Sequence, residues 1–577
     1  MPLASTHGHC TVFSAEGGGR VTDHRLKIRV ARSFAVLLAA GVLLSTAGCS
    51  KEGIYFGATD PSPGNVFRFN NGAEPEYIDP GLMAANTDER IASLLFEGLT
   101  TKDSKTLQPR PGMAERWEIA SDGLTYTFYL RKNALWSDGR PVTAQDFVYS
   151  WTRVLEPRTA SQYASQLYPI RNGEAFNQGR LKDPSQLGVK ALDDFTLQVQ
   201  LGDPVSYFLY LTSFHTLYPV PHWVVDKFGA AWVKPEHIVG NGPFRLVEHR
   251  INDRIVVERN PRYYNARQVR LDRVIAYAVV DVYTAINLYQ SGEVDWLVDN
   301  SVPPDFIPYM RGRFRDFSST PQLASYFYVF NVTRPPLDNR LVRRALAMSV
   351  DRRAITEELL RGGQIPGAHF VPEGLPGYHH PPGPEFNPQQ AARLLAEAGF
   401  PKGQGFPEME LSFNTLATHK KIAEAIQQMW AKYLNIHVTL HNEEWASFIK
   451  TRRNLEHDIA REGWIADYPD PAAFIDLIES TNGNNDTGWK NAQYDRVLAA
   501  SRKETDPARR YELLEQAEEI LLDELPVLPI YTYAVHSLLK PYVHGIYPTS
   551  LDLHPLNEVC IDRKWRERGA SENGACD

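Results

Sequence analysis

Strand and helix signals alternate along most of the chain, and this pattern limits the fold more than any other feature. Residues 123–131 (GLTYTFYLR) place apolar side chains at every second position, which indicates a strand packed on one face. Thr143 and Asp146 follow with the spacing of a helix capping box, which predicts a helix ending near Val154.

The alternation continues downstream. An Asn-Pro pair at 387–388 and Gly399 have the character of helix start and stop signals. Residues 421–434 place apolar side chains on one helical face, residues 436–440 alternate as a strand, and 506–522 form another capped helical segment. Helices interleaved with strands favour α/β lobes, and 577 residues are too many for one hydrophobic core.

The composition is that of a soluble globular protein, with 43% apolar and 23% charged residues. Asp and Glu outnumber Lys and Arg by 69 to 61, and no block of like charge occurs. Nothing in this balance favours binding to nucleic acid.

The first 50 residues have the features of an export signal. Basic residues precede the apolar run 34–44, which is too short to span a bilayer core that needs about 20 residues. The sequence Thr-Ala-Gly before Cys49 resembles a bacterial lipobox, so we predict a leader and signal peptide at 1–48. Lipidation of Cys49 would then tether the chain to a membrane by this anchor alone, followed by a linker at 49–65.

The chain has 4 cysteines, and two of them, Cys560 and Cys576, lie in its polar C-terminal segment. In an exported protein these two could form a disulfide that closes the tail. The sequence alone leaves this pairing open because it does not supply the geometry.

No catalytic signature is evident. Two SxxK matches, at 447–450 and 537–540, lack the partner motifs of that enzyme class, and His379-His380 in a proline-rich loop fits a solvated turn better than a metal site. We therefore expect no enzymatic activity, no cofactor and no metal. A cell-envelope hydrolase, and a chaperone or scaffold of the envelope, stay open as alternatives.

Residues 461–471 (REGWIADYPDP) have the pattern of a binding strand. In an extended strand Arg461, Gly463, Ile465 and Asp467 share one face, and the two charged residues are about 20 Å apart along it. A short zwitterionic peptide fits between them, and its backbone could pair with exposed groups near the glycine. The alternative for Asp467 is a structural carboxylate at the end of the strand.

Residues 114–151 (AERWEIASDGLTYTFYLRKNALWSDGRPVTAQDFVYSW) resemble the signature of the family 5 extracellular solute-binding proteins, and the resemblance runs from about 66 to 543. It is closest in character to the oligopeptide-binding proteins of ABC importers. Supporting blocks are EPRTASQYAS (156–165), NGPF (241–244), HKKIAEAIQQMW (419–430), EEWASFIKTRR (443–453) and GWIADY (463–468).

The resemblance implies a two-lobed, hinged α/β architecture of the periplasmic-binding-protein type, with an additional α/β domain and discontinuous domains. By this analogy lobe I comprises 66–97, 223–323 and 535–577, the extra domain is 98–222, and lobe II is 324–534.

The resemblance also implies roles for particular residues. Asp467 would pair with the α-ammonium of a peptide, while Arg461 and His419 would serve its carboxylate and Arg452 would be a further pocket cation. Gly463 and Ile465 would present backbone groups, and aromatic pocket walls would come from Trp445, Trp464, Tyr163 and Tyr533.

The function implied is a monomeric, lipid-anchored periplasmic receptor that binds short peptides in a closing cleft and delivers them to an inner-membrane ABC permease. Similar family members take nickel chelates, haem or oligosaccharides, so another solute is the main alternative. Some positions depart from the peptide binders: Ala324 and Ile465 stand where those proteins have a disulfide, and Ala84 and Leu360 replace an acidic residue and a lysine that contact ligand.

Overall fold

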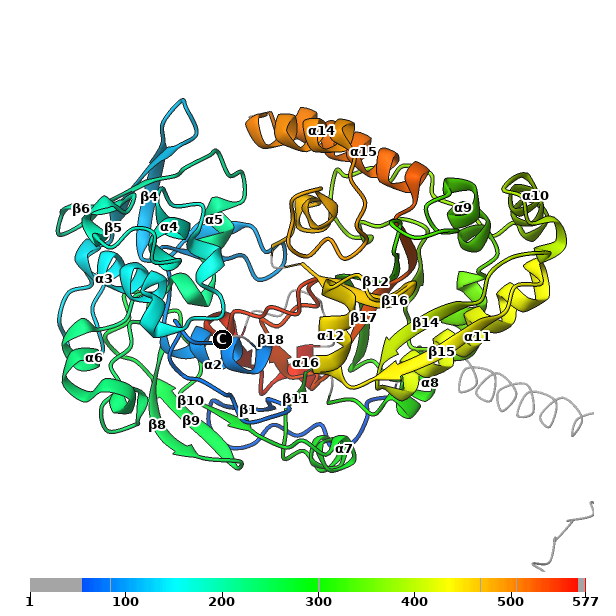
Figure 1. The fold of residues 1–577 in the computed structure, drawn as a ribbon. Helices are drawn as coiled ribbons and strands as arrows, with labels where there is room; N and C mark the ends of the chain where they lie inside the picture. The colour runs from blue at the N-terminus through cyan, green and yellow to red at the C-terminus, as the bar shows by residue number, and fades with distance from the viewer. Residues whose placement is uncertain are drawn as a thin grey trace, which may run out of the picture. The chain divides into compact units, whose positions relative to one another are not determined.

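One large mixed sheet organises the chain (Figure 1). The computed structural model describes residues 54–83, 85–298, 301–466, 468–504, 506–568 and Cys576, and from Tyr55 onward they belong to one compact unit. The predicted leader, the predicted lipidation site Cys49, the rest of residues 49–53 and Asp467 lie outside the described residues.

Within the described residues the large sheet has the strand order β15-β14-β16-β12-β17-β11-β1-β10-β9-β8, and β13 pairs with β17. Its strands are β1 (Val66–Asn70), β8 (Phe244–Arg250), β9 (Arg254–Arg259), β10 (Arg273–Tyr277), β11 (Trp296–Leu297), β12 (Phe317–Phe330), β13 (Ile365–Pro366), β14 (Met409–Asn414), β15 (Val438–Glu443), β16 (Ile459–Ile465) and β17 (Val527–Leu539).

Strands β12 and β17 connect the two ends of this sheet. They are 14 and 13 residues long and pair antiparallel over most of their length. The register between them shifts between Pro321 and Ser325, and β12 then pairs with β16 while β17 pairs with β11. Strands β12 and β17 therefore link the half of the sheet that contains β16 to the half that contains β11.

A separate four-stranded antiparallel sheet lies within residues 98–222, in the order β4-β5-β7-β6. Its strands are β4 (Ala114–Ile119), β5 (Thr125–Leu130), β6 (Val189–Asp193) and β7 (Thr196–Gln200). Helix α3 (Ala144–Leu155) packs against β6 and β7, and the carboxylate of Asp146 accepts the Thr143 backbone N–H at 2.8 Å. The predicted strand and the predicted capping box are both confirmed.

Helices cover β14 and β15 as the sequence pattern predicts. Helix α10 (Pro388–Glu397) is capped by Asn387, and α11 (Ala417–Leu434) packs on both strands, beginning four residues before the predicted start. The buried face of α11 includes Ile422, Ile426 and Trp430, so its apolar stripe joins the core around β12 and β14. The neighbouring helices are α9 (Arg340–Met348) and α12 (Trp445–Arg453), with a π-helical segment at Ala354–Leu360.

The remaining elements are α2 (Asn86–Leu95), α4 (Gly173–Asn177), α5 (Phe208–Leu211), α6 (His222–Phe228), α7 (Val282–Ser291), α8 (Ile307–Met310), α13 (Ala472–Ile475), α14 (Ala492–Lys503), α15 (Pro507–Glu524) and α16 (Trp565–Arg568), and the strand pairs β2 (Thr100–Lys102) with β3 (Pro109–Pro111) and β18 (Val543–His544) with β19 (Cys560–Ile561). Because contacts join residues 55–577 into one unit, the predicted division into two lobes and an extra domain stays a prediction.

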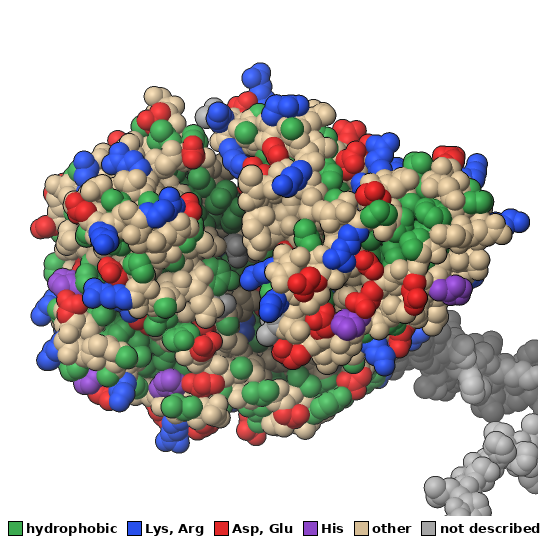
Figure 2. Space-filling view, in the orientation of Figure 1, with side chains coloured by type: hydrophobic (Ala, Val, Ile, Leu, Met, Phe, Trp, Pro, Cys, Tyr) green, Lys and Arg blue, Asp and Glu red, His purple; other side chains and the backbone are tan. Residues whose placement is uncertain are grey.

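Charges of both signs are mixed over the face shown in Figure 2, with no extended patch of one sign. Among the described helices, none combines the length and the apolar character needed to cross a bilayer. The two C-terminal cysteines form a disulfide, Cys560–Cys576, with their Cα atoms 6.2 Å apart.

Candidate functional site

Arg461 is a buried cation at the centre of the candidate site. It projects from β16 and is only 9% exposed. Its Nη2 donates to the Tyr533 hydroxyl at 2.6 Å and its Nη1 to the Asn414 side-chain oxygen at 3.5 Å, while Nε has no hydrogen-bond partner. Within the described part of the chain no carboxylate lies within 4.0 Å of this guanidinium. The site therefore holds a positive charge that the surrounding described residues do not neutralise.

Gly463 allows the Arg461 side chain to lie back along its own strand. A Cβ atom at this position would lie 2.9 Å from Arg461 Nη2 and 3.0 Å from the Tyr533 hydroxyl oxygen. Both distances are shorter than an ordinary van der Waals contact, so any larger residue would have to move the guanidinium. The position of the Arg461 side chain thus explains why residue 463 is a glycine.

Tyrosines from two strands form the floor beneath Arg461. The guanidinium carbon lies 4.7 Å from the ring centre of Tyr326, a distance typical of a cation–π interaction. Tyr326 stacks on Tyr531 at 4.7 Å, and Tyr531 meets Tyr533 edge to face at 5.2 Å. Tyr328 lies opposite Arg461 in the β12–β16 ladder, and it is fully buried.

Sequence reasoning found only Tyr533 of this group. Tyr326, Tyr328 and Tyr531 were missed, although tyrosine recurs at every second position in both β12 and β17, a signal that places the rings on one face of each strand.

His419 reaches the same floor from the first turn of α11. Its Nδ1 is 3.2 Å from the Tyr326 hydroxyl oxygen, and the side chain is buried. Burial, together with the positive charge of Arg461, lowers the pKa of His419 to about 3. The imidazole is therefore neutral at neutral pH, so one ring nitrogen donates a hydrogen bond and the other accepts one.

Strand β16 has one edge without a neighbouring strand over most of its length. It pairs with β12 as far as Ile465, but with β14 only at Ile459 and Ala460. From Arg461 onward, no described strand covers the side of β16 that faces away from β12. Peptide groups on such an edge can pair with an added extended chain.

Arg452, predicted as a pocket cation, directs its charge into the protein. Its guanidinium lies 3.0 Å from the Glu462 carboxylate and 2.5 Å from that of Asp486, and it also donates to the Arg461 carbonyl at 3.4 Å. Burial raises the pKa of Glu462 to about 7, and the positive charge of Arg452 opposes this rise. A ligand contact by Arg452 stays a prediction. In the structure Arg452 links α12 to Glu462, whose side chain lies on the face of β16 opposite Arg461.

The other predicted residues lie at different places. Trp464 is half-buried and its Nε1 has no hydrogen-bond partner, and Ile465 is 54% exposed directly opposite Ala324. The two positions that the resemblance matches to a disulfide are thus facing partners in the β12–β16 ladder. The side chain of Trp445, like Asp467, lies outside the described residues.

Tyr163 lies apart from the tyrosine floor, with its ring 5.5 Å from that of Phe214. Residues 98–222 instead approach the end of β16 through Tyr207, which stacks on Tyr468 with ring centres 3.9 Å apart. Sequence reasoning missed this contact because nothing local in either segment indicates the other. No cluster of three or more metal-ligating side chains occurs in the part of the chain that the structure describes.

The buried neutral His419 predicts a pH dependence of stability. Below pH 6.5 the unfolded chain takes up a proton that folded His419 refuses until about pH 3, so stability is lost as the pH falls through this window. The loss approaches about 1.4 kcal/mol per pH unit. In urea unfolding between pH 4.5 and 7, His419→Asn should flatten the slope of the free energy of unfolding against pH, and His437→Asn, at an exposed histidine, is the matched control. Equal slopes for His419→Asn and the parent would contradict the environment described.

Comparison with known proteins identifies the relatives of this fold and site. Residues 108–486 match the model of bacterial extracellular solute-binding proteins, family 5 Middle. The probable deoxycholate-binding periplasmic protein YgiS of Escherichia coli is 38% identical over 84% of this chain and 91% of its own length. The periplasmic oligopeptide-binding protein OppA of Salmonella typhimurium is 36% identical over 88% of this chain and 95% of its own.

Solved structures agree with these relatives. The unliganded open form of the periplasmic murein tripeptide-binding protein MppA superposes with a TM-score of 0.78, at 34% identity over 87% of this chain and 98% of that one. The complex of Haemophilus influenzae OppA with the peptide RPPGFSPFR gives a TM-score of 0.70, at 36% identity over 87% of this chain and 100% of that one. The chain belongs to the family 5 bacterial extracellular solute-binding proteins.

Proposed function

We propose that this chain binds short peptides with free termini along β16 and delivers them to an ABC permease. The observation that carries the proposal is Arg461, a buried guanidinium with no carboxylate among the described residues, beside a strand edge that no described strand covers from this residue onward. Relatives named as oligopeptide-, dipeptide- and murein-peptide-binding proteins support the same ligand class.

The charge of Arg461 favours an anionic group on the ligand. Leaving a buried charge unpaired costs about 3–5 kcal/mol, so a ligand carboxylate that reaches the unpartnered Nε or a second N–H of an Nη group of Arg461 offsets a cost already present in the site. Arg recognises carboxylates through two parallel hydrogen bonds. Neutral His419 lies on the same tyrosine floor and is available to hydrogen-bond a carboxylate or a water beside it.

The uncovered edge of β16 would bind the backbone of the peptide. An extended peptide adds to such an edge through main-chain hydrogen bonds, which do not depend on its side chains. Asp467, two residues beyond Ile465 in the chain, is proposed to pair with the peptide ammonium, as the family resemblance implies. Half-buried Trp464, with its unpartnered Nε1, and the predicted Trp445 and Tyr163 would border the side-chain pockets.

The cellular setting follows from the same family. Relatives named as periplasmic proteins support a periplasmic location, and the lipobox-like sequence supports an anchor at Cys49. The protein is proposed to act as a monomeric, non-enzymatic receptor in which lobe II (324–534) closes on lobe I and the extra domain (98–222) by a hinge motion. The paired strands β12 and β17, which run through both halves of the large sheet, are suited to be that hinge.

A bile acid is the second candidate ligand. One of the most similar relatives is named as a probable deoxycholate-binding protein, and a steroid carboxylate could pair with Arg461 above the aromatic floor. Such a ligand has no ammonium for Asp467 and no peptide groups for the edge of β16. It would leave two of the three proposed contacts unused, which is why we favour a peptide.

Calorimetric titration distinguishes these ligands. Unblocked trialanine should bind, and either N-acetylation or C-amidation should weaken binding by at least about 30-fold, since removing one partner of a buried ion pair costs about 2–5 kcal/mol. C-amidation removes the carboxylate proposed to pair with Arg461, and N-acetylation removes the ammonium proposed to pair with Asp467. Binding of deoxycholate with no response to any free peptide would replace the peptide assignment by the bile-acid one.

The fit of Arg461 over Gly463 predicts a sharp effect of one methyl group. Gly463→Ala should displace the guanidinium from Tyr533 and lower the affinity for trialanine at least about tenfold, the equivalent of one hydrogen bond to a charged group. Gly483→Ala is the matched control, because a Cβ there meets nothing within 4 Å. If calorimetry gives the same affinity for both variants, Arg461 does not hold the ligand in the conformation described.

A further inference from the structure

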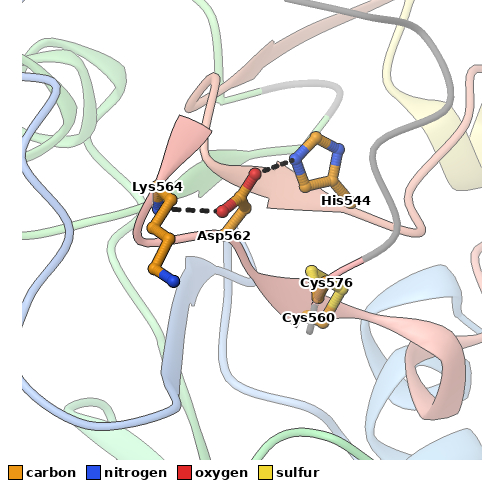
Figure 3. The surroundings of a disulfide bond; sticks show 5 residues. All are labelled: His544, Cys560, Asp562, Lys564 and Cys576. Carbon is orange, nitrogen blue, oxygen red and sulfur yellow. Dashed lines mark hydrogen bonds and ion pairs between the residues drawn. A yellow bond between two sulfur atoms is a disulfide. The ribbon is translucent and has the colours of Figure 1, made fainter. Parts of the chain in front are cut away.

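A second cavity, away from β16, lies between residues 98–131, the 263–270 loop and the C-terminal segment. Its volume is about 720 Å³, and it shares no lining residue with the site around Arg461. Figure 3 shows the disulfide Cys560–Cys576, and both cysteines line the cavity. This bond holds Cys576 covalently to Cys560 at the edge of the cavity.

Four cations line this cavity, against one carboxylate, Glu558, among its described lining residues. Two of the cations are already paired: Lys102 Nζ lies 3.1 Å from the carboxylate of Glu89, and Arg110 contacts Glu558 at 3.1 Å and Asp103 at 3.4 Å. Their charges are therefore compensated by the protein itself.

Arg131 and Arg270 are the other two cations, and no described carboxylate lies within 4.0 Å of either guanidinium. Arg131 is held in place, because its Nε donates to the Gly112 carbonyl at 2.8 Å and its guanidinium lies over the Tyr264 ring at 4.6 Å. This geometry uses the inner side of the guanidinium and leaves its Nη groups for a ligand. Arg270 lies on the loop that also carries Tyr264, and it is exposed.

The aromatic wall beside Arg131 is also fixed. The hydroxyls of Tyr263 and Tyr264 both donate to the carboxylate of Glu97, at 2.5 and 2.9 Å. Both side chains line the cavity, so their rings are held in place by a group outside it. A cavity with walls fixed by a disulfide, a carboxylate and a backbone carbonyl needs little reorganisation when a ligand enters.

We propose that this cavity is a second binding site, for a small organic anion with at least two carboxylate or phosphate groups. Two guanidiniums line this one cavity, neither with a described carboxylate within 4.0 Å, and they match two anionic groups, since each can bind a carboxylate or a phosphate through paired hydrogen bonds. The local excess of positive charge runs against the net charge of -8 of the whole chain. The volume is large enough for an organic ligand and not only for a single inorganic ion.

Citrate and pyrophosphate are the probes that test this site in calorimetric titrations of the full protein at low salt. At least one of them should bind with one-to-one stoichiometry, citrate alone indicating carboxylate ligands and pyrophosphate alone indicating phosphates. Arg131→Gln and Arg270→Gln should each weaken binding at least tenfold. Arg267→Gln, which changes an exposed arginine on the same loop but outside the cavity lining, should not.

Absence of heat from both probes at millimolar concentration would overturn the proposal, and so would equal losses in Arg131→Gln and Arg267→Gln, which would indicate non-specific attraction. Thermal melting of each variant shows whether it is folded. Because Arg461 and β16 take no part, trialanine binding should be the same in Arg131→Gln as in the parent, so this test fails or succeeds separately from that of the peptide site.

Discussion

The burial of the Arg461 guanidinium without a carboxylate among the described residues is the constraint around which the site is arranged. Tyr533 and Asn414 hold the charge by hydrogen bonds, Tyr326 lies beneath it, and Gly463 gives it space along the strand. None of these neighbours neutralises it. A buried cation in this state contributes little to the stability of the fold, and an anionic group of a ligand would provide the missing partner.

The alternation of a β-strand separates this charge from a second network. Arg461 and Gly463 point to the tyrosine floor, while Glu462 points to the opposite face and pairs with Arg452, which also contacts Asp486. The second network is complete within the protein and ties α12 to β16 from behind. One face of β16 thus carries charges that are paired within the protein, and the other carries a cation without a described carboxylate. This arrangement suits a strand that is fixed on one face and binds a ligand on the other.

The sequence predicts the local elements well and the tertiary contacts poorly. The capping box at Thr143 and the alternation at 123–131 depend on neighbours within a few residues, so both appear as predicted. Tyr531 and Tyr326 are over 200 residues apart, and only strand pairing brings them together. Arg452 matches a ligand residue by resemblance, but no local signal shows that Asp486, more than 30 residues later, takes its charge.

The most direct test of the account is native mass spectrometry of the protein purified from its own cells without refolding, followed by release and sequencing of whatever is bound. Peptides of a few residues with varied side chains, and with free amino and carboxyl ends, are the predicted result, because charge and backbone contacts provide the grip. A bile acid, a metal chelate or a single non-peptide solute in their place would contradict the assignment of Arg461 and β16 to peptide binding.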